Sequence, residues 1–169
     1  MKQKIVLAAL TLIAFTTQSF AKENPSITRK IETTSSFEKI VVGNNINLML
    51  VTDENEITVE GNAAYVNDVV ITNKNGILSV NSNDWHTAQK IIVYVPVKKL
   101  SALEITGFAK VMAADIIDTP ALNVLINGNC MLGLQTTGHI TLQHPEDIEF
   151  TFEKVKNRKQ IKTEILLEK

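Results

Sequence analysis

A repeat of 21 residues constrains the fold of this chain most strongly. Residues 103–111 and 124–132 share one pattern, in which two apolar residues alternate with others before a glycine, and a small and an apolar residue follow it. The two glycines, Gly107 and Gly128, fix the period. A short repeat with glycine after a strand is typical of stacked coils, because each coil can bury its apolar side only against a neighbour.

Two weaker copies of the pattern precede these. Residues 57–65 fit the same template, and residues 40–43 fit its first half before an extra residue shifts Ile46 and Leu48. If the coils are stacked, one dry interior column should contain Ile105, Val111, Ile126 and Leu132.

The rest of the chain consists of short strand-like runs separated by Gly, Asn, Asp and Pro. Apolar residues alternate clearly in 91–97 and 46–50, and no helical periodicity longer than two turns occurs between residues 37 and 150. The sequence therefore predicts an all-β fold, a β-solenoid or alternatively a β-sandwich. Asn75-Gly76 indicates a hairpin, although the link 73–76 predicts a longer loop than the tightest class.

The N-terminal residues have the order of an export signal. Two lysines precede an apolar run over 5–15, and a polar stretch then ends in small residues, so residues 1–21 form a predicted signal peptide cleaved after Ala21. The run is too short to span a bilayer, and no second long apolar stretch follows. We expect an exported protein, periplasmic, outer-surface or secreted, with no membrane span in the mature chain.

Three further segments follow the signal. Residues 22–36 are polar and predict an extended leader, 37–153 predict the β-solenoid domain, and 154–169 predict a basic C-terminal cap over the open end of the stack. The basic run could instead contact an anionic surface. Residues 161–167 fit a last strand or a short amphipathic helix.

Charge and cysteine content exclude several classes of function. Seventeen basic residues against 18 acidic ones leave no basic surplus for a nucleic-acid partner. The single cysteine, Cys130, excludes an internal disulfide, and it falls opposite Ala109 in the repeat. We expect a buried, inert thiol rather than a nucleophile, since no base is adjacent in sequence.

Few side chains in the sequence are suited to catalysis or metal binding. The three histidines, at 86, 139 and 144, are too dispersed to predict a metal site, and no cofactor motif is present. An enzyme acting on acidic polysaccharide would need convergent groups, for which the candidates are Asp115, Asp118, Glu104 and Lys110. The only arginines, Arg29 and Arg158, lie at the margins of the domain. We expect no catalytic residues.

Three aromatic residues are the candidate binding surface. Trp85, the only tryptophan, lies in the polar loop 81–87, where its ring could stack on a sugar or fold back to cover the core. Phe108 follows Gly107, and Tyr94 lies on the face opposite its strand neighbours Val93 and Val95, so both could add outward aromatic surface.

A series of segments resembles a known family in order and spacing: 37–48, 57–62, 76–80, 92–96, 103–107 and 126–128. The chain resembles the exported head GIN domain family, described as auto-transporter adhesins, over about two thirds of its length. The resemblance implies a right-handed parallel β-helix-like fold in an exported protein, and it brings no catalytic residues. In this chain the basic tail replaces the glycine-rich repeats common toward the family's C-terminus.

The family description implies surface binding but not self-export for this chain. A membrane barrel needs at least about eight strands of about 9 to 11 residues each. The residues of this chain that could supply such strands are expected to form the solenoid. We therefore expect a non-enzymatic β-solenoid that presents a surface for adhesion to a glycan or an envelope protein. A structural element of the cell envelope, with self-association, is the alternative, and a polysaccharide-active enzyme is a third possibility.

Overall fold

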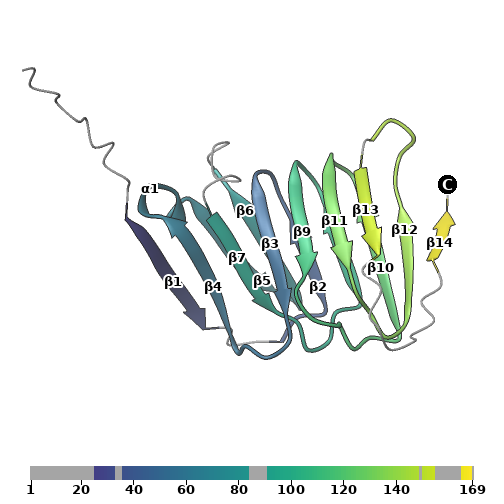
Figure 1. Ribbon diagram of the computed structural model, residues 1–169, viewed down its shortest axis with the longest axis horizontal. Helices are drawn as coiled ribbons and strands as arrows, with labels where there is room; N and C mark the ends of the chain where they lie inside the picture. The colour runs from purple at the N-terminus through teal and green to yellow at the C-terminus, as the bar shows by residue number, and fades with distance from the viewer. Residues whose placement is uncertain (1–24, 33–35, 84–90, 149, 155–164, 169) are drawn as a thin grey trace, which may run out of the picture.

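The computed structural model describes residues 25–32, 36–83, 91–148, 150–154 and 165–168. Strands dominate these residues and form two seven-stranded sheets, which face each other across one apolar core (Figure 1). The predicted all-β class is confirmed. The predicted signal peptide and its cleavage site at Ala21 lie outside the described residues.

The spatial order of the strands in each sheet differs from their order in the sequence. Sheet A contains, from one edge to the other, β1 (Ser26–Glu32), β4 (Glu56–Asn62), β7 (Ile91–Pro96), β3 (Ile46–Val51), β9 (Ala109–Ala113), β11 (Cys130–Leu134) and β13 (Phe150–Lys154). Sheet B contains, in the same manner, β14 (Ile165–Glu168), β12 (His139–Gln143), β10 (Ala121–Ile126), β8 (Ala102–Ile105), β2 (Lys39–Val42), β6 (Ile77–Ser82) and β5 (Val69–Lys74). A short helix, α1 (Ala63–Val66), follows β4.

Successive two-strand units run through most of the molecule. The pairs β8–β9, β10–β11 and β12–β13 each send one strand to sheet B and the next strand to sheet A, and consecutive units pair in parallel with each other. The earlier unit β2–β3 pairs in the same way with β8–β9. Corresponding strands therefore lie side by side along the molecule (Figure 1).

The 21-residue repeat sets the register between two of these units. Ile105 pairs with Ile126 and Val111 pairs with Leu132, and all four side chains are fully buried in one core. Glycines of the two units also meet, since a Cβ on Gly128 would lie 2.6 Å from backbone atoms of the preceding unit's glycine. The predicted interior column is confirmed.

The first copy of the repeat fits without the predicted extra residue. Val42 pairs with Ile105, and four residues further on Ile46 pairs with Ala109, so the two units have turns of equal length. The predicted shift of the following strand is wrong. Asn44 occupies the position that a glycine has in the later unit, and its side chain is directed toward that unit, where its Oδ1 accepts a hydrogen bond from the N–H of Phe108.

The predicted copy at residues 57–65 is also wrong. Strand β4 runs antiparallel to both of its neighbours, β1 and β7, and is not part of the parallel series. The chain leaves the strand at Asn62, whose Oδ1 accepts a hydrogen bond from the N–H of Ala64 at 2.9 Å and so begins α1. Apolar alternation before a glycine is common to many strands, so this match did not indicate a stacked unit.

The hairpin between β5 and β6 is present, with a tighter turn than expected. Lys74 pairs with Ile77, leaving a two-residue loop in which Asn75 has a φ of 53° and Gly76 a φ of 75°. Two successive positive φ values are those of a type I′ turn. The two predicted link residues before Asn75 belong to the strand instead.

Both ends of the chain contribute strands to the sheets. Residues 26–32, within the predicted extended leader, form β1, which pairs antiparallel with β4 at the edge of sheet A. Near the other end, β13 pairs in parallel with β11, and β14 pairs in parallel with β12. Of the two structures expected for residues 161–167, the strand is the one observed at residues 165–168, and residues 161–164 lie outside the described residues.

Candidate functional site

The predicted aromatic binding residues do not form one cluster in the described structure. Trp85 lies outside the described residues. Tyr94 lies on β7, on the outer face of sheet A, where it pairs with Thr58 of β4 and Met49 of β3. Phe108 lies in the turn between β8 and β9.

Phe108 is the most exposed large apolar side chain of the described residues, at 62%. Its N–H donates to Oδ1 of Asn44 at 3.2 Å, and its carbonyl accepts from the N–H of Asn45 at 2.7 Å, so its backbone is held while its ring faces water. Tyr94 and Met112 both pair with Met49 of β3, so these three residues lie in one row across sheet A. Met112 lies on β9, four residues after Phe108. The two aromatic positions are thus separated by about 13 Å along the strand direction.

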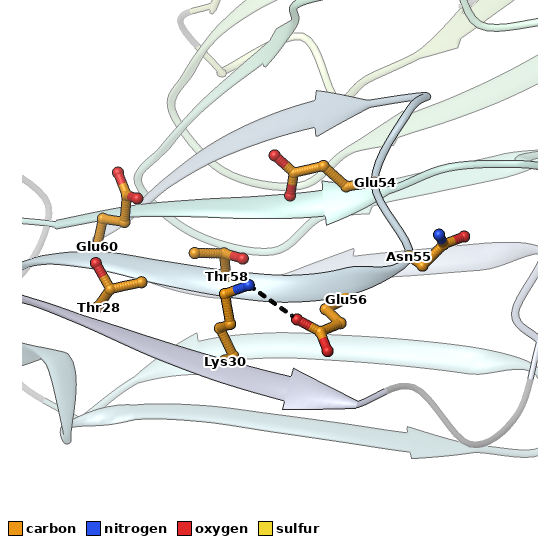
Figure 2. Close-up of a pocket in the computed structure, with 7 residues that line it drawn as sticks. All are labelled: Thr28, Lys30, Glu54, Asn55, Glu56, Thr58 and Glu60. Atoms are coloured by element: carbon orange, nitrogen blue, oxygen red, sulfur yellow. Dashed lines mark ion pairs between the residues drawn. The ribbon is translucent and has the colours of Figure 1, made fainter.

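A hollow of 490 Å³ lies on the outer face of sheet A near its β1 edge. Figure 2 shows the side chains around it, which come from β1, β4 and the turn before β4: Thr28, Lys30, Glu54, Asn55, Glu56, Thr58 and Glu60. Every one of these side chains carries a hydroxyl, amide, amine or carboxylate group. The hollow is therefore a polar surface site.

Antiparallel pairing of β1 with β4 places these groups together. Thr28 pairs with Glu60 and Lys30 pairs with Thr58, and paired residues project to the same side of a sheet. The alternate residues of β4, Ile57 and Val59, are fully buried in the core and hold the strand in place. Alternation along one strand thus produces both the core and the polar hollow.

Carboxylates outnumber the basic side chain that lines the hollow. Lys30 Nζ lies 3.2 Å from Oε2 of Glu56 in an exposed ion pair, shown by the dashed line in Figure 2. Glu54 and Glu60 bring the number of carboxylates to three. The side chain of Asn55 accepts a hydrogen bond at its Oδ1 from Lys98 Nζ at 2.8 Å. The site presents acceptors to a ligand and is unfavourable for an anionic one.

Tyr94 adjoins the hollow through Glu60. Burial raises the pKa of the Tyr94 hydroxyl above its usual value, and the negative charges of Glu60 and Glu54, together with a hydrogen bond to Glu60, add to the increase. The hydroxyl is thus held protonated and donates to a carboxylate that lines the hollow. Tyr94 is thus next to the hollow, although it is not one of the residues that line it.

Sequence reasoning missed the rest of the hollow. Thr28 and Glu60 are 32 positions apart, and nothing in the repeat indicates that the first polar segment pairs with β4. The signal that could have indicated a strand there is weak: Ile27 and Ile31 fall on one side of an extended segment and Thr28 and Lys30 on the other, but the charged Arg29 interrupts the apolar side.

The carboxylates considered for catalysis serve structural bonds. Oδ2 of Asp115 accepts from the N–H and hydroxyl of Thr52 at 3.0 and 3.2 Å, and Asp118 accepts from the hydroxyl of Thr137 at 2.9 Å. Glu104 forms a 2.6 Å ion pair with Lys39 on sheet B, whereas Lys110 lies on sheet A. These groups do not converge on one wall.

Cys130 is buried at the start of β11, opposite Ala109 as the repeat predicts. Burial raises the pKa of its thiol from 9.0 to about 11. We expect alkylation by iodoacetamide at neutral pH to be at least about 100-fold slower in the native protein than in guanidinium, because two pKa units remove that fraction of thiolate. Reaction at the same rate in both states would contradict this.

The same thiol makes stability depend on alkaline pH. Its raised pKa means that unfolding releases a proton above pH 9, so this contribution to stability is present below pH 9 and is lost as the pH rises to about 11.

Metal and membrane chemistry have no support in the part of the chain that the structure describes. No three histidine, cysteine or acidic side chains there come close enough to hold a metal ion. The helix α1 has four residues, and no helix in the described part of the chain is long and apolar enough to cross a bilayer.

The family model described as "Putative auto-transporter adhesin, head GIN domain" matches residues 36–150. The chain belongs to this family. A search of curated proteins gives no match.

Several solved structures from Parabacteroides species are similar to this chain. A "putative adhesin" from Parabacteroides distasonis ATCC 8503 matches with a TM-score of 0.44 and 13% identity over 77% of this chain and 71% of that one. Another from Parabacteroides merdae ATCC 43184 has a TM-score of 0.42 and 13% identity over 85% and 96%. A "putative lipid binding protein" from P. distasonis has a TM-score of 0.44 and 14% identity over 74% and 59%.

Proposed function

We propose that this protein is an exported, non-enzymatic adhesion module that binds a glycan at the hollow beside Tyr94. The observation that carries the proposal is the hollow itself, whose seven lining residues all offer hydrogen-bonding groups. Export follows from the N-terminal signal pattern, and the final location is periplasmic, outer-surface or secreted. Membership of an adhesin family supports a binding role.

The framework of this module is proposed to be a short β-solenoid. Four two-strand units in parallel register, from β2–β3 to β12–β13, support a solenoid over a β-sandwich, because sandwich sheets are predominantly antiparallel. The antiparallel strands β4, β5 and β1 then close the end of the stack that carries the hollow.

A glycan fits the chemistry of the hollow better than an envelope protein does. Sugars carry many hydroxyl groups, which the carboxylates and Asn55 can accept from and which Lys30 can donate to. Tyr94 supplies an aromatic edge, and Glu60 holds its hydroxyl in a fixed orientation. An envelope protein would instead be expected to use an apolar contact centre.

A glycan array with the purified protein tests this proposal. We expect binding to neutral oligosaccharides and weaker binding to acidic ones, because three carboxylates face the ligand. Tyr94→Ala should weaken affinity for the best glycan about 10-fold, equivalent to about 1.4 kcal/mol. Isothermal titration calorimetry would measure this.

Phe108→Ala is the matched control, since it removes an exposed aromatic ring away from the hollow. It should leave affinity within about twofold of the parent. Absence of binding across the array, or equal loss in both variants, would overturn the proposal. Tyr94→Phe, which keeps the ring and loses the bond to Glu60, separates the two contributions of the side chain.

A further inference from the structure

We propose that the glycan bound in the hollow carries a protonated amino group, which Glu60 and Thr58 of β4 recognise. A hexosamine that lacks its N-acetyl group is the simplest such sugar. This proposal rests on the proposed function, because it names the class of glycan that the same hollow binds.

Thr58 presents an unused hydrogen-bonding group to the hollow. Its side chain lines the cavity, although the residue is only 9% exposed. Its hydroxyl makes no hydrogen bond with any other residue that the structure describes. Folded proteins rarely leave a buried hydroxyl without a partner, so a bound ligand is expected to supply one. The hydroxyl oxygen can accept a hydrogen bond, which is what an ammonium group requires.

The basic side chain that lines the hollow is directed away from Glu60. Lys30 pairs with Thr58 and so lies between the rows of Glu56 and Glu60 on the outer face of the sheet. Its Nζ lies 3.2 Å from Oε2 of Glu56, and Figure 2 shows Glu60 on the opposite side of the hollow. The partner of Glu60 on β1 is Thr28, which is uncharged. Glu60 thus has no ion-pair partner among the described residues and can pair with a cation of the ligand.

Tyr94 adds an aromatic ring beside these groups. It pairs with Thr58 across β4 and β7, and its hydroxyl donates to Glu60. Burial is the largest cause of the raised pKa of Tyr94, and the negative charges of Glu60 and Glu54 raise it further. Both carboxylates therefore make the potential beside the ring negative. An aromatic ring next to carboxylates attracts an ammonium group by cation–π and ionic interactions together.

An ammonium group matches the hollow better than a neutral hydroxyl or an N-acetyl group does. Three carboxylates against one lysine leave two negative charges of the lining residues uncompensated. A carboxylate only accepts hydrogen bonds, and an ammonium group only donates them, through three N–H bonds. N-acetylation removes the charge and leaves one N–H donor. The free amine is therefore the group for which this surface can discriminate.

Isothermal titration calorimetry with two matched ligands tests the proposal. The ligands are oligomers of glucosamine and of N-acetylglucosamine of equal length, which differ only in the acetylation and charge of the amine. At slightly acidic pH and low salt, we expect the glucosamine oligomer to bind at least about 10-fold more tightly. Added salt should reduce this preference, because it screens the ionic part of the interaction.

Glu60→Gln identifies the carboxylate responsible. Glutamine keeps an acceptor for the hydroxyl of Tyr94 but carries no charge, so the preference should fall at least about fivefold. Affinity for the N-acetylglucosamine oligomer should stay within about threefold of the parent. Thr58→Val keeps the shape of the side chain without its hydroxyl and should weaken binding of the glucosamine oligomer about threefold.

Glu38→Gln is the matched control for a general attraction between an acidic protein and a cationic ligand. It removes the same charge from an exposed site just before β2, in the other sheet, and should leave the preference unchanged. Equal affinity for the two oligomers, or an equal effect of Glu60→Gln and Glu38→Gln, would overturn the proposal. Neutral glycans that still bind and still depend on Tyr94 would then leave the proposed function standing, whereas an array without any binding would remove both.

Discussion

Ile126→Ala is expected to lower the free energy of unfolding by about 2–5 kcal/mol. Ile126 is fully buried on β10 and pairs with Ile105 in the preceding unit. Truncation removes apolar contacts and leaves a cavity that packed neighbours on both sides cannot fill. Urea unfolding followed by circular dichroism would measure the change.

The adjacent residue supplies a matched control. Leu125 lies on the same strand but faces outward and is only half-buried, so Leu125→Ala should cost about 1 kcal/mol or less. Equal costs for the two variants would show that β10 does not present one side to a shared interior.

Gly128→Ala is the second change with a large expected effect, a loss of about 2–3 kcal/mol. The added Cβ would lie 2.6 Å from Cα and N of Gly107, which are backbone atoms of the neighbouring unit. The two turns can accept this methyl group only by moving apart, which disturbs the hydrogen bond from the N–H of Asn127 to the carbonyl of Ile105. Thermal or urea unfolding gives the value.

Gly107→Ala tests whether backbone contact is the cause. Its Cβ would meet mainly the side-chain amide of Asn44, which can turn aside at the cost of its bond to the N–H of Phe108. We expect a smaller loss, about 1 kcal/mol. If Gly128→Ala proved neutral, or cheaper than Gly107→Ala, the close stacking of these turns would be refuted.

The part of the fold that rests on a local repeat could be predicted from the sequence. Pairing of Ile105 with Ile126 and of Val111 with Leu132 follows from a fixed period, because each unit repeats the geometry of the one before. The burial of Cys130 follows from the same alignment, since it takes the place of Ala109.

The end of the molecule that contains the antiparallel strands β4 and β5 could not be predicted from the repeat. Strands β4 and β5 run against the parallel series, and β7 lies between β4 and β3 although it follows them both in sequence. Such pairings depend on which edges remain open after the units have formed, and residues 57–65 matched the repeat on alternation alone. The hollow belongs to this end, so only Tyr94 among its neighbours was identified in advance.

The most direct test of the proposed binding site is an NMR titration of backbone amide shifts with the neutral oligosaccharide that the array selects. The proposal predicts that the largest shifts occur on three adjacent strands of sheet A, at Thr28, Lys30, Thr58, Glu60 and Tyr94. Shifts confined to sheet B or to the turn at Phe108, or no shifts at saturating ligand, would contradict it.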